Sequence, residues 1–227
     1  MKITKYIHSC LVFEQNNFKL LVDPGNYTFA DGLLSADDFA DVSAILITHI
    51  HADHLDMDNI KKIIALSNAP VFGNKQVAQA LQKEGINAIL FTDGVRMFGQ
   101  MEFKAMPIIH MPLLDSPIPE MTGYVINGNI LHSVDSMDAS LTQIAGIDLL
   151  ILPIMAPFCN ELQVTQFADA LKPKHILPVH DGYAKAFFVK LRSQTYLKHF
   201  EARGITFLQP PEAHISNGTT VVFKFAI

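Results

Sequence analysis

The run from Thr48 to Asp56, THIHADHLD, constrains this chain more than any other part of its sequence, and it directly follows the apolar segment AILI. Four side chains that bind metals, His49, His51, Asp53 and His54, fall within six positions. In a chain of 227 residues with ten histidines, the pattern H-x-H-x-D-H arises by chance on the order of once in a thousand such sequences. The run therefore predicts a metal site.

The spacing of these residues fits a strand that ends in a tight turn. Side chains at positions i and i+2 of a strand point to the same side, so His49 and His51 can converge on one ion. A turn into a helix near Leu55 then places Asp53 and His54 at a second, adjacent position. Imidazole and carboxylate ligands suit zinc and also iron, manganese or nickel, so the ligand types leave the metal open.

Two metal ions need more ligands than one turn supplies, and the sequence offers three further candidates. His110 ends the apolar run KAMPIIH, Asp135 follows the run NILHS, and His180 ends the run HILPVH. Each polar side chain stands where a predicted strand stops, which is where open sheets collect their functional residues. We expect these three to join the turn in a dinuclear site.

Predicted strands are interleaved with predicted helices without strict alternation, which favours an α+β fold of packed sheets with helices outside. No linker rich in Gly, Ser or Pro is visible, so we expect one domain over residues 1–227. Strands are expected at residues 3–13, 18–22, 44–47, 70–72, 95–109, 123–126, 130–131, 149–152, 176–179 and 219–225. Helices are expected at 55–67, at 74–83 with Asn74 as N-cap, at 164–171 and at 183–203.

Composition excludes several classes of protein. Hydrophobic residues make up 49% and charged residues 17% of the chain, which is typical of a globular protein. The net charge of −5 argues against binding to nucleic acid by charge. No apolar run reaches the roughly 20 residues of a membrane span, and the N-terminus does not resemble a signal peptide. With two cysteines and no sign of export, we expect a cytoplasmic protein.

The ligand pattern resembles that of the metallo-β-lactamase superfamily of metal-dependent hydrolases. Within it, His8-Ser9-Cys10, His54-Leu55-Asp56 and Leu177-Pro178-Val179-His180 are similar to the ascorbate-6-phosphate lactonase-like branch of small cytoplasmic hydrolases. The resemblance spans nearly the whole chain and implies a four-layer αββα sandwich, two mixed β-sheets flanked by helices.

The resemblance also implies a role for each candidate residue. The first metal would be held by His49, His51 and His110, and the second by Asp53, His54 and His180, with Asp135 as the bridge. Asp23, in LLVDPG, matches the aspartate that supports the site from behind. One departure is the turn Ser133-Val134-Asp135-Ser136, where the superfamily commonly has Gly-Asp-Thr. The stretch after Leu152 also lacks the glycine-rich form of this branch.

Other residues have competing interpretations. His8 could contact substrate or relay a proton at the metals, or be buried and structural. Asp181 could orient the ring of His180 or cap the following helix. His132 is expected to be structural, and three further histidines to be solvated, namely His175, His199 and His214.

Sulfur and aromatic residues are expected mainly to fill the core. Cys10 and Cys159 are either soft ligands or small buried hydrophobes. Three methionines near His110 either line a pocket over the metals or fill the core, namely Met106, Met111 and Met121. The aromatic residues of one long helical stretch are expected to pack in the core: Phe187, Phe188, Tyr196 and Phe200.

These observations predict a metal-dependent hydrolase. Two divalent ions and two ligand aspartates leave the pocket with a charge of about +2, so we expect it to attract anions. A water bound to such ions ionises near pH 7, and the resulting bridging hydroxide could attack a small anionic ester, lactone or phosphoester while Asp53 moves protons. The alternatives are a phosphodiesterase or nuclease, and a metal-binding or sensing protein without activity. A homo-oligomer is compatible with the sequence.

Overall fold

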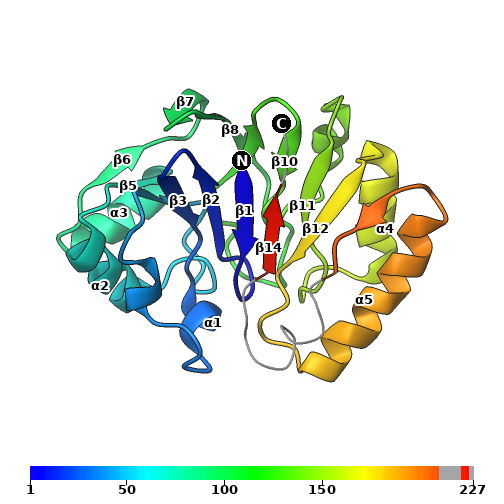
Figure 1. Ribbon diagram of the computed structural model, residues 1–227, viewed down its shortest axis with the longest axis horizontal. Helices are drawn as coiled ribbons and strands as arrows, with labels where there is room; N and C mark the ends of the chain where they lie inside the picture. The colour runs from blue at the N-terminus through cyan, green and yellow to red at the C-terminus, as the bar shows by residue number, and fades with distance from the viewer. Residues whose placement is uncertain (210–220, 225–227) are drawn as a thin grey trace.

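The computed structural model describes residues 1–209 and the backbone of residues 221–224. Its strands form two mixed sheets of seven strands each (Figure 1). The first sheet has the order β14-β1-β2-β3-β4-β5-β6, and the second has the order β13-β12-β11-β10-β9-β8-β7. In each sheet four neighbouring strands pair antiparallel, β14-β1-β2-β3 in the first and β10-β9-β8-β7 in the second, and the remaining strands pair in parallel.

The bounds of the elements follow the sequence prediction closely in the helices. The strands of the first sheet are β1 Lys2–Lys5, β2 Leu11–Gln15, β3 Phe18–Val22, β4 Ala44–Ile47, β5 Val71–Gly73, β6 Ala88–Leu90 and β14 Val221–Lys224. The strands of the second sheet are β7 Gly94–Phe98, β8 Met101–Ile108, β9 Met121–Ile126, β10 Ile130–His132, β11 Leu149–Pro153, β12 His175–Val179 and β13 Thr206–Phe207. The helices are α1 Asn26–Phe29, α2 Met57–Ser67, α3 Lys75–Lys83, α4 Glu161–Leu171 and α5 Ala186–Glu201, with short 3-10 helices η1 Ala36–Phe39 and η2 Ala139–Gln143.

Two predicted strands were each wrong as single elements. The run at residues 3–13 is the hairpin β1–β2, and the run at 95–109 is the hairpin β7–β8. In the second case Gly99, with a φ of 60°, makes a turn inside an otherwise apolar run. The predicted helix cap is confirmed, because the Asn74 side chain accepts a hydrogen bond from the Val77 amide.

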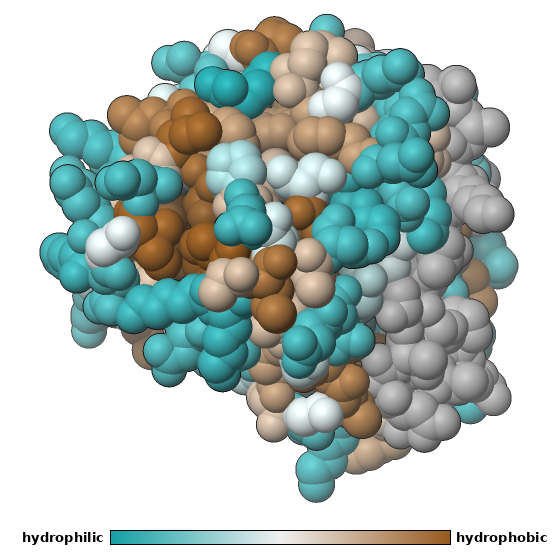
Figure 2. Space-filling view, turned by 60° about the vertical axis from the view of Figure 1, so that its left-hand side comes forward, coloured by the Kyte–Doolittle hydropathy of each residue, from teal (hydrophilic) through white to brown (hydrophobic). Residues whose placement is uncertain are grey.

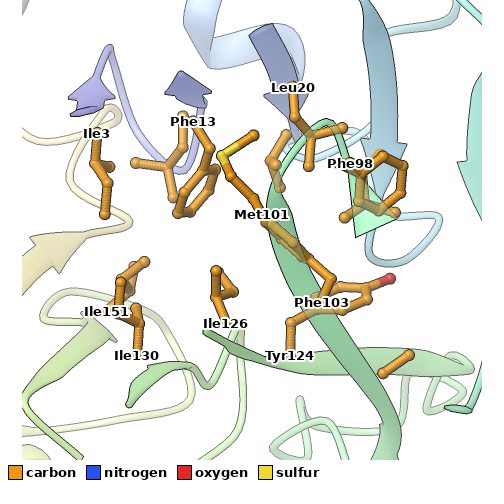
Figure 3. Close-up of a cluster of buried hydrophobic side chains, with 14 of the residues drawn as sticks. Ile3, Phe13, Leu20, Phe98, Met101, Phe103, Tyr124, Ile126, Ile130 and Ile151 are labelled. Atoms are coloured by element: carbon orange, nitrogen blue, oxygen red, sulfur yellow. The ribbon is translucent and has the colours of Figure 1, made fainter. Parts of the chain in front are cut away.

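Three layers of apolar side chains hold the sandwich together. The central layer lies between the sheets, where Ile3, Phe13 and Leu20 face Ile126 and Ile130 (Figure 3). A second layer packs the first sheet against α2 and α3, and a third packs the other sheet against α4 and α5. The expected four-layer αββα arrangement is therefore confirmed (Figure 1).

The aromatic residues of α5 divide between core and surface. Tyr196 and Phe200 are fully buried and stack on each other, as predicted. Phe187 is 70% exposed and Phe188 is 38% exposed, so their prediction as core residues was wrong. Helical periodicity explains the difference, since positions 196 and 200 share the face of α5 that packs on the sheet, whereas 187 and 188 lie off it.

Apolar side chains are also exposed on the edge strands. Ile89 and Leu90 on β6, and Val95 and Met97 on β7, are all more than two fifths exposed. The side of the molecule turned forward in Figure 2 shows apolar patches divided by hydrophilic residues. Within residues 1–209 and 221–224, no helix is long and apolar enough to cross a membrane.

Candidate metal centre

The H-x-H-x-D-H run forms the connection between β4 and α2, as its spacing predicts. After β4 ends at Ile47, the backbone turns, and the amide of His54 donates to the carbonyl of His51. The side chain of Asp56 then caps α2 by accepting from the Asn59 amide. The rings of His49 and His51 approach within 3.2 Å, Nε2 to Nδ1. The turn thus gathers ligand atoms at the end of the first sheet.

The second sheet brings its candidates to the same place. His110 follows β8, Asp135 follows β10 and His180 follows β12, each just beyond the strand end. The Oδ2 atom of Asp135 lies 3.2 Å from Nε2 of His54, 3.3 Å from Nε2 of His180 and 3.5 Å from Nε2 of His110. Asp135 is therefore central, in the place expected for a bridging carboxylate.

The ligand atoms fall into two groups, in each of which all atoms lie within 4.8 Å of one another. The first group is His49, His51, His110 and Asp135, and the second is His8, Asp53, His54 and His180. All seven residues predicted as ligands are thus brought together, and Asp135 touches both groups through its contacts with His54 and His180.

The donor set fits divalent cations. The Nε2 atoms of His54, His110 and His180 are buried, and no hydrogen-bond partner satisfies them. A buried polar atom left without a partner is costly, and a metal ion is the partner that neutral imidazole nitrogens and carboxylates share. The two groups are therefore two possible metal sites.

The far side of each ring fixes its orientation. Nδ1 of His54 donates to Oδ2 of Asp23 at 2.8 Å, and Nδ1 of His180 donates to the carbonyl of Met155 at 2.7 Å. Nδ1 of His110 likewise donates to the carbonyl of Met111. A proton held on Nδ1 leaves Nε2, which faces the centre in each ring, as the nitrogen that can bind a metal ion.

Asp23 lies where the sequence prediction put it, behind the site at the end of β3. Its buried carboxylate accepts from the amide of Thr48 at 2.8 Å and from the Thr48 hydroxyl at 2.7 Å, in addition to His54. The predicted roles of Asp181 were wrong. Its carboxylate binds Nζ of Lys5 at 2.9 Å, because Lys5 is buried on β1 and needs a counter-ion.

His8 points into the second group, and its partners settle its tautomer. The amide of Gly182 donates to Nδ1 of His8 at 3.0 Å, so the ring proton is on Nε2, which donates to Oδ2 of Asp53 at 3.1 Å. His8 has a φ of 61° and sits against Gly182, where a Cβ would come within 2.7 Å of the His8 side chain. This close approach is available only to glycine.

Burial and the neighbouring carboxylates shift the pKa values of the histidines in opposite directions. Burial lowers the pKa of His49 and His51 and lowers that of His8 to about 4, so these rings are neutral at pH 7. Burial also acts against the charge of His180, but Asp135 outweighs it and raises the pKa of His180 to about 9. The pKa of His54 is raised for the same reason, with Asp135 and Asp23 outweighing burial.

The two carboxylates of the centre are ionised. Burial opposes the charge of Asp135, yet the histidines around it, His180 and His54 first, hold its pKa well below the usual range. The pKa of Asp53 is also lowered, because His180, whose Nε2 lies 3.2 Å from Oδ2, and the hydrogen bond from His8 together overcome burial. Without metal, the centre is thus a network of carboxylates and protonated imidazoles, and cations would replace those protons.

The turn that carries Asp135 keeps an unusual backbone. Val134 has a φ of 50°, a left-handed conformation that a β-branched residue rarely adopts, and its side chain is buried. Asp23 and His180 also have positive φ, 49° and 68°. The departure from Gly-Asp-Thr therefore leaves Asp135 in position, at the cost of strain beside the site.

The remaining candidates lie outside the two groups. His132 is buried, and burial lowers its pKa to about 4, in agreement with a structural role. His199 is ion-paired with Asp169 at 3.1 Å rather than merely solvated. His175 is partly buried, and its main-chain amide donates to the carbonyl of Asp148 at 2.8 Å. His214 lies outside the described residues. Cys10 is buried in the first sheet's outer layer, away from ligands.

A cavity of about 600 Å³ opens beside the second group. Asp53 and His180 line it, together with Cys159, which sequence reasoning left open, and Tyr27 and Tyr183. Of the three methionines, Met121 is buried, and none of them lines this cavity; the methionine that does is Met155. Tyr183 and Phe158, whose rings pack on His180, carried no sequence signal because their contacts join segments distant in the chain.

Comparisons with known proteins match most of this chain. The model of the β-lactamase superfamily domain matches residues 2–180. A UPF0173 metal-dependent hydrolase of Alkaliphilus metalliredigens is 32% identical over 200 residues, covering 79% of this chain and 85% of that protein. Protein Rv0786c of Mycobacterium tuberculosis is 28% identical over 187 residues, covering 80% of this chain and 84% of the relative.

Solved structures with low identity share the fold. Igni18, described as a novel metallo hydrolase from Ignicoccus hospitalis, is 18% identical with a TM-score of 0.69, and each chain is covered completely. A possible metal-dependent hydrolase from Veillonella parvula is 14% identical with a TM-score of 0.69, covering 97% of this chain and 98% of the other. On the family match, the identity to the UPF0173 protein and the paired ligand groups, this chain belongs to the metallo-β-lactamase superfamily.

Proposed function

We propose that this protein is a dinuclear metal-dependent hydrolase that acts on a small anionic ester, lactone or phosphoester. The observation that carries the proposal is the pair of adjacent ligand groups that meet at Asp135, with buried imidazole nitrogens aimed inward and without hydrogen-bond partners. Zinc is the metal expected first for a set of imidazoles and carboxylates, and manganese, iron and nickel fit the same ligands.

When bound, two divalent cations would supply a hydroxide at neutral pH and stabilise negative charge on a carbonyl or phosphoryl oxygen. The residues of the chain divide the other tasks. Asp53 is the ligand candidate whose side chain is partly open to the cavity, so its carboxylate can accept a proton from the nucleophile and return it to the leaving group. His8 donates to Oδ2 of Asp53 and holds that carboxylate in place.

The branch within the superfamily is part of the proposal. The similarity of the residues around His8, His54 and His180 to ascorbate-6-phosphate lactonase-like proteins favours a lactone or a related ester. The cavity of about 600 Å³ accommodates a small molecule. The net charge of −5 argues against a nuclease.

The first experiment counts metal ions. Elemental analysis of protein purified without chelator should give about two ions per chain, with less in His110→Ala and in His180→Ala. His199→Ala is the matched control, because His199 lies on α5 with Asp169 as its partner. The proposal fails if the purified protein binds no metal and cannot be loaded with any.

The second experiment separates an enzyme from a metal sensor. Metal-loaded protein is assayed on a panel of lactones, carboxylic esters and phosphoesters, next to a generic phosphodiester. Asp53→Asn keeps a neutral ligand oxygen but cannot take up a proton, so activity should fall about 100-fold or more while bound metal falls much less. A sensor would bind metal and show no metal-dependent turnover on any member of the panel.

A further inference from the structure

The walls of the cavity beside the second ligand group carry information about the substrate. Asp53 and His180 form its polar part next to the metal ligands. Most of the rest is apolar or aromatic, with Tyr27, Met155 and Phe188 among the lining side chains. Walls of this kind bind the apolar body of a ligand and leave its orientation to a few polar groups.

Arg192 of α5 is one of those polar groups, and it is the guanidinium among the described residues that line the cavity, a cation whether or not metal is bound. Its side chain is only 19% exposed. The guanidinium carbon lies 5.2 Å from the centre of the Phe188 ring, so the guanidinium group makes a cation–π contact with another residue that lines the cavity.

The ion pair of Arg192 with Glu161 does not account for this placement. Nη1 of Arg192 binds Oε1 of Glu161, whose side chain is 47% exposed, more than twice as much as that of Arg192. Because Glu161 is about half exposed, water screens this ion pair and limits its contribution to folding. The pair alone therefore does not explain why Arg192 lines the cavity. A guanidinium has five N–H donors, and the contacts of Arg192 with Glu161 and with the Tyr196 hydroxyl leave others to offer.

We infer that the substrate is an ester or lactone with an apolar body and a carboxylate remote from the reacting bond, and that Arg192 binds this carboxylate. The inference rests on the proposed function and names its substrate class. Arginine matches a carboxylate in planar, two-point geometry. A carboxylate fits better than a phosphate, because Glu161 already neutralises part of the arginine charge and a dianion would remain uncompensated.

The kinetic test uses two esters that differ in one terminal group, mono-4-nitrophenyl glutarate and 4-nitrophenyl valerate. The metal-loaded protein should favour the glutarate about 10- to 100-fold in kcat/KM, mainly through a lower KM. In Arg192→Met, which keeps an apolar stem over Phe188, the ratio should fall toward one, and Arg192→Lys should keep part of it. Arg203→Met is the control, because Arg203 is also ion-paired, to Asp169, but lies outside the cavity.

A binding test answers the same question without turnover. Chelator-treated protein should bind 4-phenylbutyrate at least about 10-fold more tightly than 4-phenylbutanol or 4-phenylbutyl phosphate, and Arg192→Met should lose this preference. Titration calorimetry measures the three ligands. Equal binding of acid and alcohol, a preference for the phosphate, an unchanged preference in Arg192→Met, or no binding of the acid overturns the inference.

The two tests keep this inference apart from the proposed function. If the loaded protein hydrolyses both esters equally, the carboxylate contact is wrong and the hydrolase stands. If it hydrolyses neither ester nor any member of the wider panel, the proposed function fails, and calorimetry alone decides whether Arg192 binds a carboxylate.

Discussion

Replacing Asp23 by asparagine should weaken metal binding without touching a ligand. Oδ2 of Asp23 accepts the proton on Nδ1 of His54 at 2.8 Å, which leaves the lone pair of Nε2 toward the centre. An amide NH₂ in place of Oδ2 is a donor, so Nδ1 of His54 must become an acceptor and its proton must move to Nε2. The substitution thus protonates the nitrogen that would bind the metal.

The size of the effect follows from what is lost. Outer hydrogen-bond partners of metal-binding histidines are worth about 10- to 100-fold in affinity, or about 1.4 to 2.8 kcal/mol. The metal-free protein also loses the charged acceptor of two buried hydrogen bonds, from Nδ1 of His54 and from the Thr48 hydroxyl, each worth about 1.5 to 3 kcal/mol because Asp23 is fully buried. The amide of Thr48 still has Oδ1 as its acceptor.

Competition with a chromophoric chelator measures the affinity for zinc, and urea denaturation of chelated protein measures the free energy of unfolding. Asp41→Asn is the matched control, since Asp41 is exposed and paired with Lys19 on the surface. Affinity of Asp23→Asn within twofold of the unmodified protein would refute the reasoning on the His54 tautomer.

Four further predictions concern the site and the residues that support it. The pKa of His54 is raised and that of His180 is raised to about 9, so both rings are protonated at pH 7 without metal. Zinc binding should therefore release up to about two protons, which calorimetry in buffers of different ionisation enthalpy detects. Binding heats that do not depend on the buffer would contradict these pKa shifts. The stability that charged His180 gives the metal-free protein is complete below about pH 6.5 and is lost as pH rises toward 9, which urea denaturation at several pH values checks. Gly25→Ala would place a Cβ 1.9 Å from the carbonyl of Asp53, so we expect a loss of about 3 kcal/mol or more in unfolding free energy. A loss under about 1 kcal/mol would show that the backbone around Asp53 moves aside at little cost. Tyr196→Phe removes a buried hydrogen bond to a main-chain carbonyl and should cost about 1 kcal/mol by the same measurement, with no change in metal content.

The ligands could be predicted from the sequence because each stands at a strand end or in one short motif. Because the fold brings these strand ends to one edge, a residue's position at the end of a predicted strand is enough to place it in the site, as it is for His110, Asp135 and His180. The layers of the sandwich were predictable on the resemblance to the superfamily. The helices were predictable from their periodicity and caps.

What the sequence did not reveal depends on contacts between distant segments. Asp181 neighbours His180 in sequence but pairs with Lys5, 176 positions away. The aromatic residues of α5 could not be divided between core and surface without the sheet on which the helix packs. The hairpin β7–β8 was hidden because Gly99 interrupts an apolar run without changing its composition. Likewise, only the fold shows that Arg192 and Asp53 share one cavity.

Each ligand group draws side chains from both sheets. His49 and His51 follow β4 of the first sheet, whereas His110 and Asp135 follow β8 and β10 of the second, and the other group joins Asp53 to His180 in the same way. An ion in either group would be bound by side chains of both sheets and would cross-link the two halves of the sandwich. Loss of metal would therefore weaken the contact between the two sheets at this end. Amide hydrogen exchange should therefore quicken on chelation at the ends of β4, β8 and β12 before it quickens in the apolar layer between the sheets.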